Sequence, residues 1–346
     1  MQNEITKREK LLDQNGNIKN PGFAKKLLWD YDRKDIKAGK MRIKEWDYYY
    51  IGTQEYGLCL TISDAGYVSC LSISLLSFKD NPMQMNDSEI GLFPLGKLNL
   101  PSTSETGNIS AKVGTAEMTF NNDSKTRHLF GKYDNYCNSK KQLIFDVVLS
   151  DFPEESMVIA TPFNKDKHFY YNQKINCMKA KGYVKFGDIE WKFTPENNAL
   201  ATLDWGRGVW TYDNTWYWGS GQTVLDDGST FGFNIGYGFG DTSAASENML
   251  FYNGKSHKLE DIKFNIPKDG DKYLYTKPWT FTSSDGRFEM TFKPIIDRQA
   301  PLDIKIMCML PHQVFGLMSG TAILDDGTVI EIKDKLVFAE RVHNKW

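Results

Sequence analysis

Alternation of apolar and polar residues, broken by short turns, restricts the fold of this chain more than any other feature. In the stretch "KEWDYYYI", Trp46, Tyr48 and Tyr50 fall on one side. The stretches "HFYYNQKI", "KGYVKFGDIEWKF", "RFEMTFKPII" and "LDIKIMCML" alternate in the same way. A period of two is the spacing of side chains on one face of a β-strand. We therefore expect a chain built mainly of strands.

Turn residues separate these strands at short intervals. Four short runs contain aspartate and end in glycine, a composition typical of hairpin corners: Asp64-Ala65-Gly66, Asp226-Asp227-Gly228, Ser284-Asp285-Gly286 and Asp325-Asp326-Gly327. A hairpin joins two neighbouring strands, so we expect successive strands to be antiparallel.

A helical period occurs only briefly. Short helices are expected in "GFAKKLLWDY" near the start, in "ENNALATLDWG" and in the terminal "KDKLVFAERVHNKW", each a few turns long at most. The predicted fold class is all-β with short capping helices.

An internal similarity indicates two units of one kind. Gly182 opens the hairpin "GYVKFGDIEWKF" and Gly320, 138 residues later, opens "GTAILDDGTVIEI"; each hairpin is followed by an expected short helix ending at a tryptophan. Such self-similarity is typical of duplicated units, although two unrelated β units could share a hairpin by chance. We expect an N-terminal strap over residues 1–40, a first unit over 41–212 and a second over 213–346.

Charge and hydropathy exclude several classes of partner. The chain has 42 basic and 44 acidic residues, so no strong overall field attracts nucleic acid. The charged N-terminus lacks the apolar core of a signal peptide, and no run of about 18 apolar residues occurs. We expect a soluble, cytoplasmic protein that is not inserted in a membrane.

Metal and nucleotide motifs are missing from the sequence. The cysteines have no CxxC spacing and the five histidines no HxH or HExxH spacing, which favours reduced, mostly buried thiols and no metal site. The stretch "GLFPLGKL" has leucine where a phosphate-binding loop needs serine or threonine, and no helix is expected after it. No G-x-S-x-G elbow occurs either. We expect no cofactor.

An aromatic segment near the middle of the chain, "DWGRGVWTYDNTWYWGSG", has four tryptophans and begins with the acid Asp204, which lies close to Arg207. A carboxylate in such surroundings must pair with a cation or a hydrogen-bond donor, or take up a proton. Asp204 is therefore either half of a buried pair with Arg207 or a candidate acid.

The stretch "TFGFNIGYGFG" has unequal faces if it is a strand. Phe231, Phe233, Ile235, Tyr237 and Phe239 lie on one face, and four glycines with Asn234 lie on the other. A bare glycine face admits the close approach of something else. That object is either another part of the fold or a flat ligand.

Across nearly its whole length, the chain resembles a bacterial family known only as a domain of unknown function, family 2804. The resemblance rests on "LLDQNGNIKNPGFAKKLLWDYDRKDIKAGKMRIKEWDYYYI", "PLGKLNLPSTSETG", "ATLDWGRGVW" and "FAERVHNKW". That family is distantly similar to the double-calycin group, which includes carotenoid hydratases of the hydroxyneurosporene synthase type and tocopherol cyclases.

The resemblance implies two tandem antiparallel lipocalin-like β-barrels, with an apolar ligand within or between them. It also implies that Trp205 and Arg207 close one end of the first barrel, as a tryptophan and an arginine commonly do in lipocalin-type barrels. The other aromatic residues of the segment exceed what that closure needs, so we look for a ligand there.

These observations favour a protein that binds a small apolar molecule in an aromatic-lined pocket larger than about 300 Å³. The alternatives are a cofactor-free hydratase, cyclase or isomerase acting on a lipid- or polyene-like substrate, a carbohydrate-binding or carbohydrate-active protein, and a purely structural partner. Asp204 and Glu45 are the candidate catalytic acids. The predicted ligand-binding residues are Trp46, Tyr48, Arg207, Trp210, Tyr212, Trp216, Trp218, Asn234 and Tyr237. The sequence leaves the oligomeric state open.

Overall fold

The computed structural model describes residues 2–299, 302–304 and 307–345, and strands dominate it. Helices in this described part are four 3-10 turns of three residues each: η1 (Arg33–Asp35), η2 (Lys40–Arg42), η3 (Tyr136–Asn138) and η4 (Pro195–Asn197). The predicted all-β fold with two barrel-like sheets is confirmed.

The three segments expected to be helical are not helices. The first contains β2 (Gly22–Ala24) and β3 (Trp29–Asp30), the second passes from η4 into β15 (Leu200–Val209), and the third lies in β27 (Val329–Lys345). β15 and β27 are each hydrogen-bonded to a strand on both sides. Both faces are buried along all of β15 and over residues 336–340 of β27, so their apolar runs resemble a helical pattern. Trp346, the expected end of the last helix, lies outside the described residues.

The first sheet contains β2 and the strands from β4 to β15. Its main path is β7-β6-β5-β4-β15-β13-β11-β10-β9-β8, while β12 and β14 pair with β13, and β2 pairs with β12. The bounds are β4 Ile43–Gly52, β5 Tyr56–Asp64, β6 Val68–Ser77, β7 Met83–Leu92, β8 Gly107–Val113, β9 Ala116–Asn122, β10 Arg127–Tyr133, β11 Leu143–Ser150, β12 Met157–Pro162, β13 Phe169–Phe186 and β14 Ile189–Phe193.

The second sheet has the order β19-β18-β17-β16-β27-β26-β24-β23-β20, with β25 paired to β26. The bounds are β16 Asp213–Val224, β17 Thr230–Tyr237, β18 Met249–Tyr252, β19 Lys255–Lys258, β20 Ile262–Asn265, β23 Trp279–Ser283, β24 Phe288–Arg298, β25 Leu302–Ile304 and β26 Met307–Ile323. Two small pairs complete the strands, β1 (Glu9–Lys10) with β3 and β21 (Lys268–Asp269) with β22 (Lys272–Tyr273).

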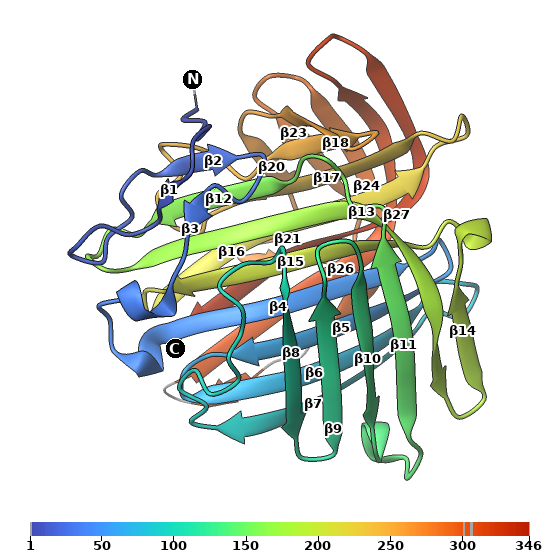
Figure 1. The fold of residues 1–346 in the computed structure, drawn as a ribbon. Coiled ribbons are helices and arrows are strands. Elements are labelled where there is room, and N and C mark those ends of the chain that lie inside the picture. The colour runs from blue at the N-terminus through green and yellow to red at the C-terminus, as the bar shows by residue number, and fades with distance from the viewer. Residues whose placement is uncertain (1, 300–301, 305–306, 346) are drawn as a thin grey trace.

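The two sheets form two barrel-like bodies, the first nearly closed and the second half-open, which lie against each other (Figure 1). The chain passes from the first sheet to the second between β15 and β16, at the place where we expected the second unit to begin. Residues 2–40 contribute β2 to the first sheet and pack apolar side chains such as Trp29 on its core. The division into a strap and two domains stays a prediction.

All four predicted hairpin corners join neighbouring antiparallel strands: β5 to β6, β16 to β17, β23 to β24 and β26 to β27. The glycine that ends each run has a positive φ, between 68° and 86°, a conformation that glycine adopts without strain. These predictions are confirmed.

Gly182 and Gly320 have the same local geometry. Their φ angles are 152° and 151°, and a Cβ on either would overlap a carbonyl oxygen of the neighbouring strand, that of Asp146 or Glu289. Only glycine fits at either position. The correspondence supports the predicted duplication, which stays a prediction.

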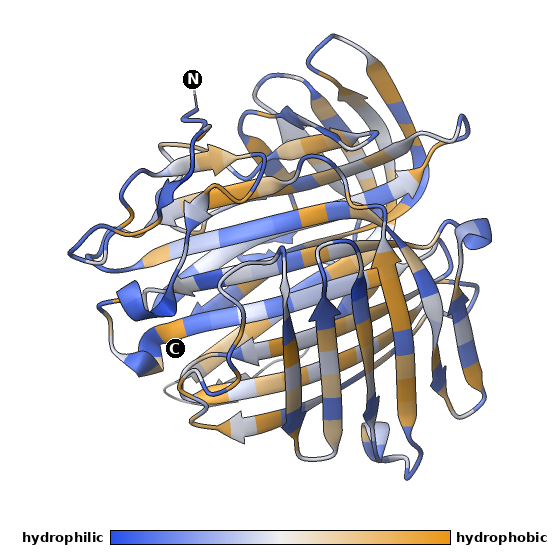
Figure 2. Cartoon of the chain, in the orientation of Figure 1, coloured by the Kyte–Doolittle hydropathy of each residue, from blue (hydrophilic) through white to orange (hydrophobic). Residues whose placement is uncertain are grey.

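Each barrel has its own hydrophobic core, and two further apolar clusters lie between the barrels. Orange and blue bands alternate along the strands of the first sheet in Figure 2, as expected for strands with one buried face. On β4, Tyr49 and Ile51 enter the first core, whereas Tyr48 and Tyr50 join a cluster with Trp218 and Phe338 of the second barrel. The predicted alternation therefore separates the barrel interior from the seam between barrels.

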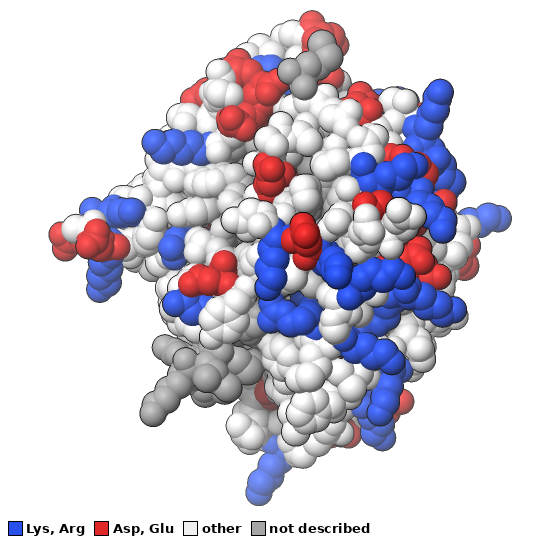
Figure 3. All heavy atoms as spheres, turned by 90° about the vertical axis from the view of Figure 1, so that its left-hand side faces the viewer, with Lys and Arg blue, Asp and Glu red and all other residues white. Residues whose placement is uncertain are grey.

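Acidic and basic side chains both occur on the face shown in Figure 3, and neither sign covers it. Among the described residues, no helix has the length and apolarity needed to cross a membrane. No disulfide joins the cysteines of the described residues. Cys59 is buried and the other four residues are partly exposed, while burial raises the pKa of the Cys59, Cys70 and Cys177 thiols. The expectation of buried thiols holds for these three.

Candidate functional site

A space lined by tryptophan, tyrosine and phenylalanine rings lies between the two barrels and has a volume of about 290 Å³. Strands β4, β5, β13 and β15 of the first barrel and β16, β26 and β27 of the second contribute to its wall. We call it the large cavity. It touches Asp204, Trp210, Trp216, Trp218 and Phe239, within the region where we expected a pocket, and its volume is close to the expected lower bound.

Four aromatic rings from separate strands and loops form one wall of the large cavity. Trp46 stacks on Tyr170 with 6.3 Å between ring centroids and meets Trp210 edge-on at 5.3 Å. Phe239 contacts Tyr170 and Trp210, each at 4.9 Å. A Cβ on Gly206, which lies opposite Trp46 in the ladder, would overlap the indole ring. Gly206 therefore makes room for Trp46, which explains one glycine of "DWGRG".

A buried ion pair forms part of the polar lining. Asp204 on β15 accepts a hydrogen bond from Asn172 at 2.6 Å and pairs with the Lys174 ammonium at 2.9 Å. Lys174 Nζ also lies 3.9 Å from the centre of the Trp218 ring, a cation–π distance. Only 7% of Asp204 and 3% of Lys174 is exposed, so each charge depends on its partners in place of water.

Glu340 on β27 is a second buried acid in the wall. Its two oxygens accept hydrogen bonds from Trp216 Nε1 at 2.9 Å and Gln313 Nε2 at 3.0 Å. Gln313 Oε1 in turn accepts from Arg298 at 2.7 Å. Burial raises the pKa of Glu340 from 4.5 to about 7, against the opposing effects of the Trp216 hydrogen bond and the Lys174 charge. Glu340 can therefore hold or release a proton near neutral pH.

Glu247, in the segment before β18, is the third acid of this group. Asn234 Nδ2 donates to its carboxylate at 3.2 Å, and Asn234 Oδ1 accepts from Trp218 Nε1 at 2.7 Å. A Cβ on Gly236 would lie 2.6 Å from the Glu247 carboxylate. Burial raises the pKa of Glu247 as well, against the charge of Lys174.

The glycine face of β17 meets protein, not open space. A Cβ on Gly232 would lie 2.8 Å from Cys177 Sγ of β13, and Gly236 makes room for Glu247. Phe231, Phe233 and Ile235 fill the second core. Of the two explanations left open for this stretch, close approach by another part of the fold holds at these glycines.

Arg207 does not pair with Asp204, which corrects the expected ion pair. Consecutive residues of a strand point to opposite faces at even and odd positions, so Arg207 enters the first barrel with Trp205 while Asp204 faces the seam. The Arg207 guanidinium lies 4.2 Å from the centre of the Trp205 ring and donates to Asp47 at 3.1 Å. Both side chains are fully buried, consistent with the closing role implied by the resemblance. Arg207 is outside the large cavity.

The other predicted site residues fall into two groups: those that line the large cavity and those that pack elsewhere in the fold. Trp46, Tyr48, Trp210, Trp216, Trp218 and Asp204 line the large cavity. Glu45 also borders it, but its carboxylate is held by Tyr31 at 2.7 Å and by Arg33. Asn234 lies behind Trp218, Tyr237 stacks on Tyr217 at 4.5 Å beside the second core, and Tyr212 is half exposed. None of these last three lines the cavity.

Sequence reasoning missed Tyr170, Lys174, Glu247, Arg298, Gln313 and Glu340, which also line the cavity. A signal was present for two of them, because alternation in "HFYYNQKI" puts Tyr170 and Lys174 on one face. A lysine in an apolar strand indicates a buried acidic partner. Glu340 was missed because its segment was interpreted as a helix.

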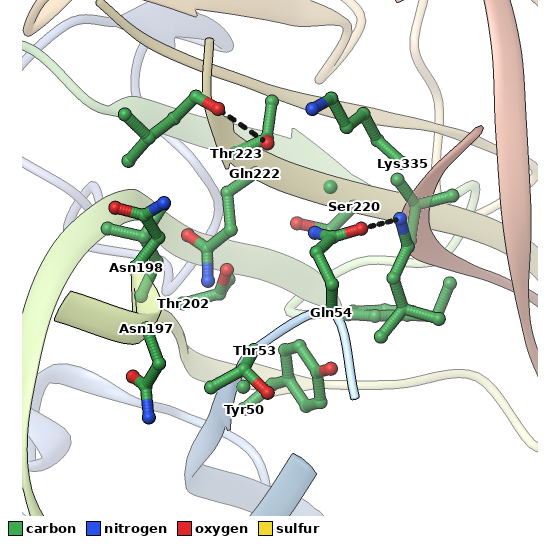
Figure 4. A pocket seen from close by; sticks show the side chains of 17 residues that line it. Tyr50, Thr53, Gln54, Asn197, Asn198, Thr202, Ser220, Gln222, Thr223 and Lys335 are labelled. Atoms are coloured by element: carbon green, nitrogen blue, oxygen red, sulfur yellow. Dashed lines mark hydrogen bonds between the residues drawn. The ribbon is translucent and has the colours of Figure 1, made fainter. Parts of the chain in front are cut away.

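A second space, of about 100 Å³, lies farther along the same seam (Figure 4). We call it the small cavity. Polar, uncharged side chains such as Thr53, Thr202, Ser220 and Gln222 dominate its lining, with Lys335 as its one charged residue. Leu336 N–H donates to Gln54 Oε1 at 2.8 Å there, joining the two barrels.

The fold and the large cavity define a class of all-β protein with two barrel-like sheets and a candidate ligand space between them. The chain belongs to the family described as "Domain of unknown function (DUF2804)", whose profile matches residues 2–346. The resemblance seen in the sequence is thus confirmed. No curated protein sequence matches the chain.

Solved structures share the architecture. A protein described as AttH from Nitrosomonas europaea is 12% identical with a TM-score of 0.52, over 90% of this chain and 95% of that one. This likeness shows the fold alone. Kievitone hydratase from Nectria haematococca (TM-score 0.47, 11% identity, 98% of each chain) and CghA with Sch210972 (TM-score 0.41, 8% identity, 97% of each chain) are more distant. Neither of these two carries an argument about function.

Proposed function

We propose that this protein binds a small, mainly apolar molecule in the large cavity. The observation that carries the proposal is the combination of about 290 Å³ of space with tryptophan, tyrosine and phenylalanine rings and a few converging polar groups. Small-molecule sites are typically concave and apolar, with a few polar groups that fix the orientation of the ligand.

Packing energetics support a ligand in this space. Aromatic side chains that face an unfilled space lose the dispersion contacts that a close-packed interior provides. A ligand that covers about 200 Å² of apolar surface would recover about 5 kcal/mol before the costs of binding. Polar groups at Asp204, Lys174 and Glu340 would select its orientation.

Proton transfer to such a ligand is the second candidate function, and the state of Glu340 favours it. Its raised pKa of about 7 leaves a proton available near neutral pH, while Asp204 is ion-paired with Lys174. Two acids in different environments suit the roles of proton donor and acceptor. In a hydration, Glu340 would protonate an alkene carbon, water would add to the resulting cation, and Asp204 would accept the proton that water loses.

A carbohydrate ligand is less well supported. Trp210 and Trp218 are only 8% and 5% exposed, so they are not open stacking platforms for a saccharide chain. This burial favours a ligand that enters the seam.

The proposal is tested by titrating the protein with N-phenyl-1-naphthylamine, an uncharged fluorescent probe, and by native mass spectrometry for a co-purified apolar molecule. Thr61 on β5 lines the large cavity, and Thr61→Phe should fill part of it and weaken probe binding at least tenfold. Ser72 on β6 is paired with Thr61 but is not part of the lining, so Ser72→Phe is the matched control and should bind normally.

Two results would overturn the proposal. The first is a wild-type protein that carries no apolar molecule and binds no probe. The second is equal probe binding by Thr61→Phe and the wild type, because the probe would then bind elsewhere.

A further inference from the structure

The lining of the large cavity contains more carboxyl groups than cations. Five acidic side chains border it against three basic ones, Lys44, Lys174 and Arg298. Three of the acids have partners within the protein: Glu45 pairs with Arg33, Asp204 with Lys174, and Asp64 accepts backbone N–H bonds from Gly66 and Gly96.

The remaining two acids, Glu247 and Glu340, have hydrogen bonds but no ion pair. Their hydrogen-bond donors are neutral side chains: Asn234 for Glu247, and Trp216 and Gln313 for Glu340. Lys174 is occupied by Asp204, and Arg298 donates to Gln313, Ser74 and Asn86. Among the described residues, these two carboxyl groups, like that of Asp64, form no ion pair, so they carry charge without a directly bound cation when they ionise. The charge of Lys174 acts on both from farther away.

The aromatic rings around these acids are also suited to a positive charge. A cation is attracted to the face of an aromatic ring, and tryptophan is the strongest partner. The cavity already contains one example, because the Lys174 ammonium lies 3.9 Å from the centre of the Trp218 ring. Trp216 joins the two features directly, since its indole N–H donates to Glu340 while its ring borders the cavity.

We propose that the ligand of the large cavity is an organic cation, with a quaternary or tertiary ammonium group beside Glu340 and Glu247 and an apolar body of one or two rings against the tryptophans. This inference rests on the proposed function and names the chemical class of its ligand. An anionic ligand is disfavoured because the protein's own acids already occupy Lys174 and outnumber the cations of the lining.

The pH dependence of binding follows from the groups that face Glu340: Asp204, Lys174, Arg298, Glu247, Tyr48 and Tyr170. Burial raises the pKa of both tyrosines, so they stay neutral near pH 7. A bound cation favours the ionised form of Glu340, whose pKa is about 7 without ligand. Affinity for a cation should therefore rise with pH up to about 7, by at most about tenfold per pH unit from this group, and level off above.

The experiment compares two probes of the same shape, benzyltrimethylammonium and neopentylbenzene, in which carbon replaces the charged nitrogen. Their affinities are measured by quenching of tryptophan fluorescence and by displacement of N-phenyl-1-naphthylamine, at pH 8 and pH 5.5. At pH 8 the cation should bind about tenfold more tightly than the neutral probe, a difference typical of a desolvated cation–π and ionic contact. At pH 5.5 most of this preference should be lost.

Glu340→Gln tests the assignment of the charge. This variant should lose most of the cation preference and its pH dependence while it still binds neopentylbenzene. Glu331 lies on the same strand but is exposed, so Glu331→Gln should behave as the wild type. Glu247→Gln provides a second test if Glu340→Gln does not fold.

Equal affinity for the two probes at pH 8 would overturn the cation assignment and leave the proposed apolar site intact. The same conclusion follows if both glutamine variants keep the wild-type preference. Failure of both probes and of N-phenyl-1-naphthylamine to bind would instead refute the proposed function.

Discussion

The two cavities of the seam share four strands but have opposite character. β4, β15, β16 and β27 each contribute to both, with Trp46, Asp204, Trp216 and Glu340 at the large cavity and Tyr50, Thr202, Ser220 and Phe338 at the small one. Carboxyl groups and tryptophan rings line the large cavity, whereas hydroxyl and amide groups dominate the lining of the small cavity. The difference indicates that a single seam can hold both the proposed ligand site and a structural joint.

The joint is made by close hydrogen bonding between barrels. At the bulge of β13, Asn176 Nδ2 donates to Ser220 Oγ at 2.8 Å, and Cys177 N–H donates to Gln222 Oε1 at 2.6 Å. At the large cavity, by contrast, wide aromatic side chains meet without filling the space between them. Small polar side chains near the small cavity thus allow the strands of the two barrels to approach closely. At the large cavity, the aromatic rings keep these strands farther apart.

Trp218 borders the large cavity and packs at 4.9 Å on Phe338 of the small one, so its removal should have the largest effect. Trp218→Ala should lower the free energy of unfolding by about 4 kcal/mol, the usual cost of deleting a buried tryptophan side chain. It should also remove the cation–π partner of Lys174. Chemical denaturation measures the first effect, and probe titration should show weakened binding; an unchanged stability would contradict the assigned packing.

Asp204→Asn should destabilise the protein by about 3 kcal/mol, because it leaves the Lys174 ammonium buried without its counter-charge. Asp151→Asn is the matched control, since Asp151 forms an ion pair with Lys179 of the same strand at the same 2.9 Å but both side chains are exposed. The control should cost less than about 1 kcal/mol. Equal effects of the two variants on thermal unfolding would contradict a buried role for Asp204.

Glu340→Gln should make the protein more stable at high pH. The pKa of Glu340 is raised on folding from 4.5 to about 7, so ionisation opposes folding; the cost is complete above pH 7 and absent below 4.5. At pH 8 the free energy of unfolding of the variant should exceed that of the wild type by about 2 kcal/mol. The increase is smaller than the full cost of ionisation because the hydrogen bond from Gln313 is weakened. Chemical denaturation across pH measures this difference in stability. In the wild type, the infrared band of the protonated Glu340 carboxyl should disappear near pH 7, and the variant should lack this band. A gain that does not depend on pH would refute the titration.

Thr202→Val at the small cavity should have the smallest effect. It removes a buried hydroxyl whose contact with Asn176 is long, 3.4 Å, so the expected loss is about 1 kcal/mol. Probe binding at the large cavity should be unchanged. Loss of probe binding in this variant would show that the two ends of the seam are not independent.

The sequence predicted the fold better than the site. Alternation and turn residues were sufficient for many of the strands and for the four hairpins, because both are local properties of the chain. The surplus of aromatic residues beyond Trp205 indicated Trp210, Trp216 and Trp218, and these line the large cavity. Local patterns could not show that Asp204 pairs with Lys174 instead of Arg207, because that pairing depends on which strands become neighbours. Glu340 was hidden because β27 is paired on both sides, and its continuous apolar run resembles a helix.

The most direct test of the central claim is a crystal structure of the protein carrying N-phenyl-1-naphthylamine or its co-purified ligand. We expect density for the bound molecule in the large cavity, in contact with Trp46, Trp216 and Trp218. An empty large cavity, with the molecule bound in the small cavity or on the surface, would contradict the claim.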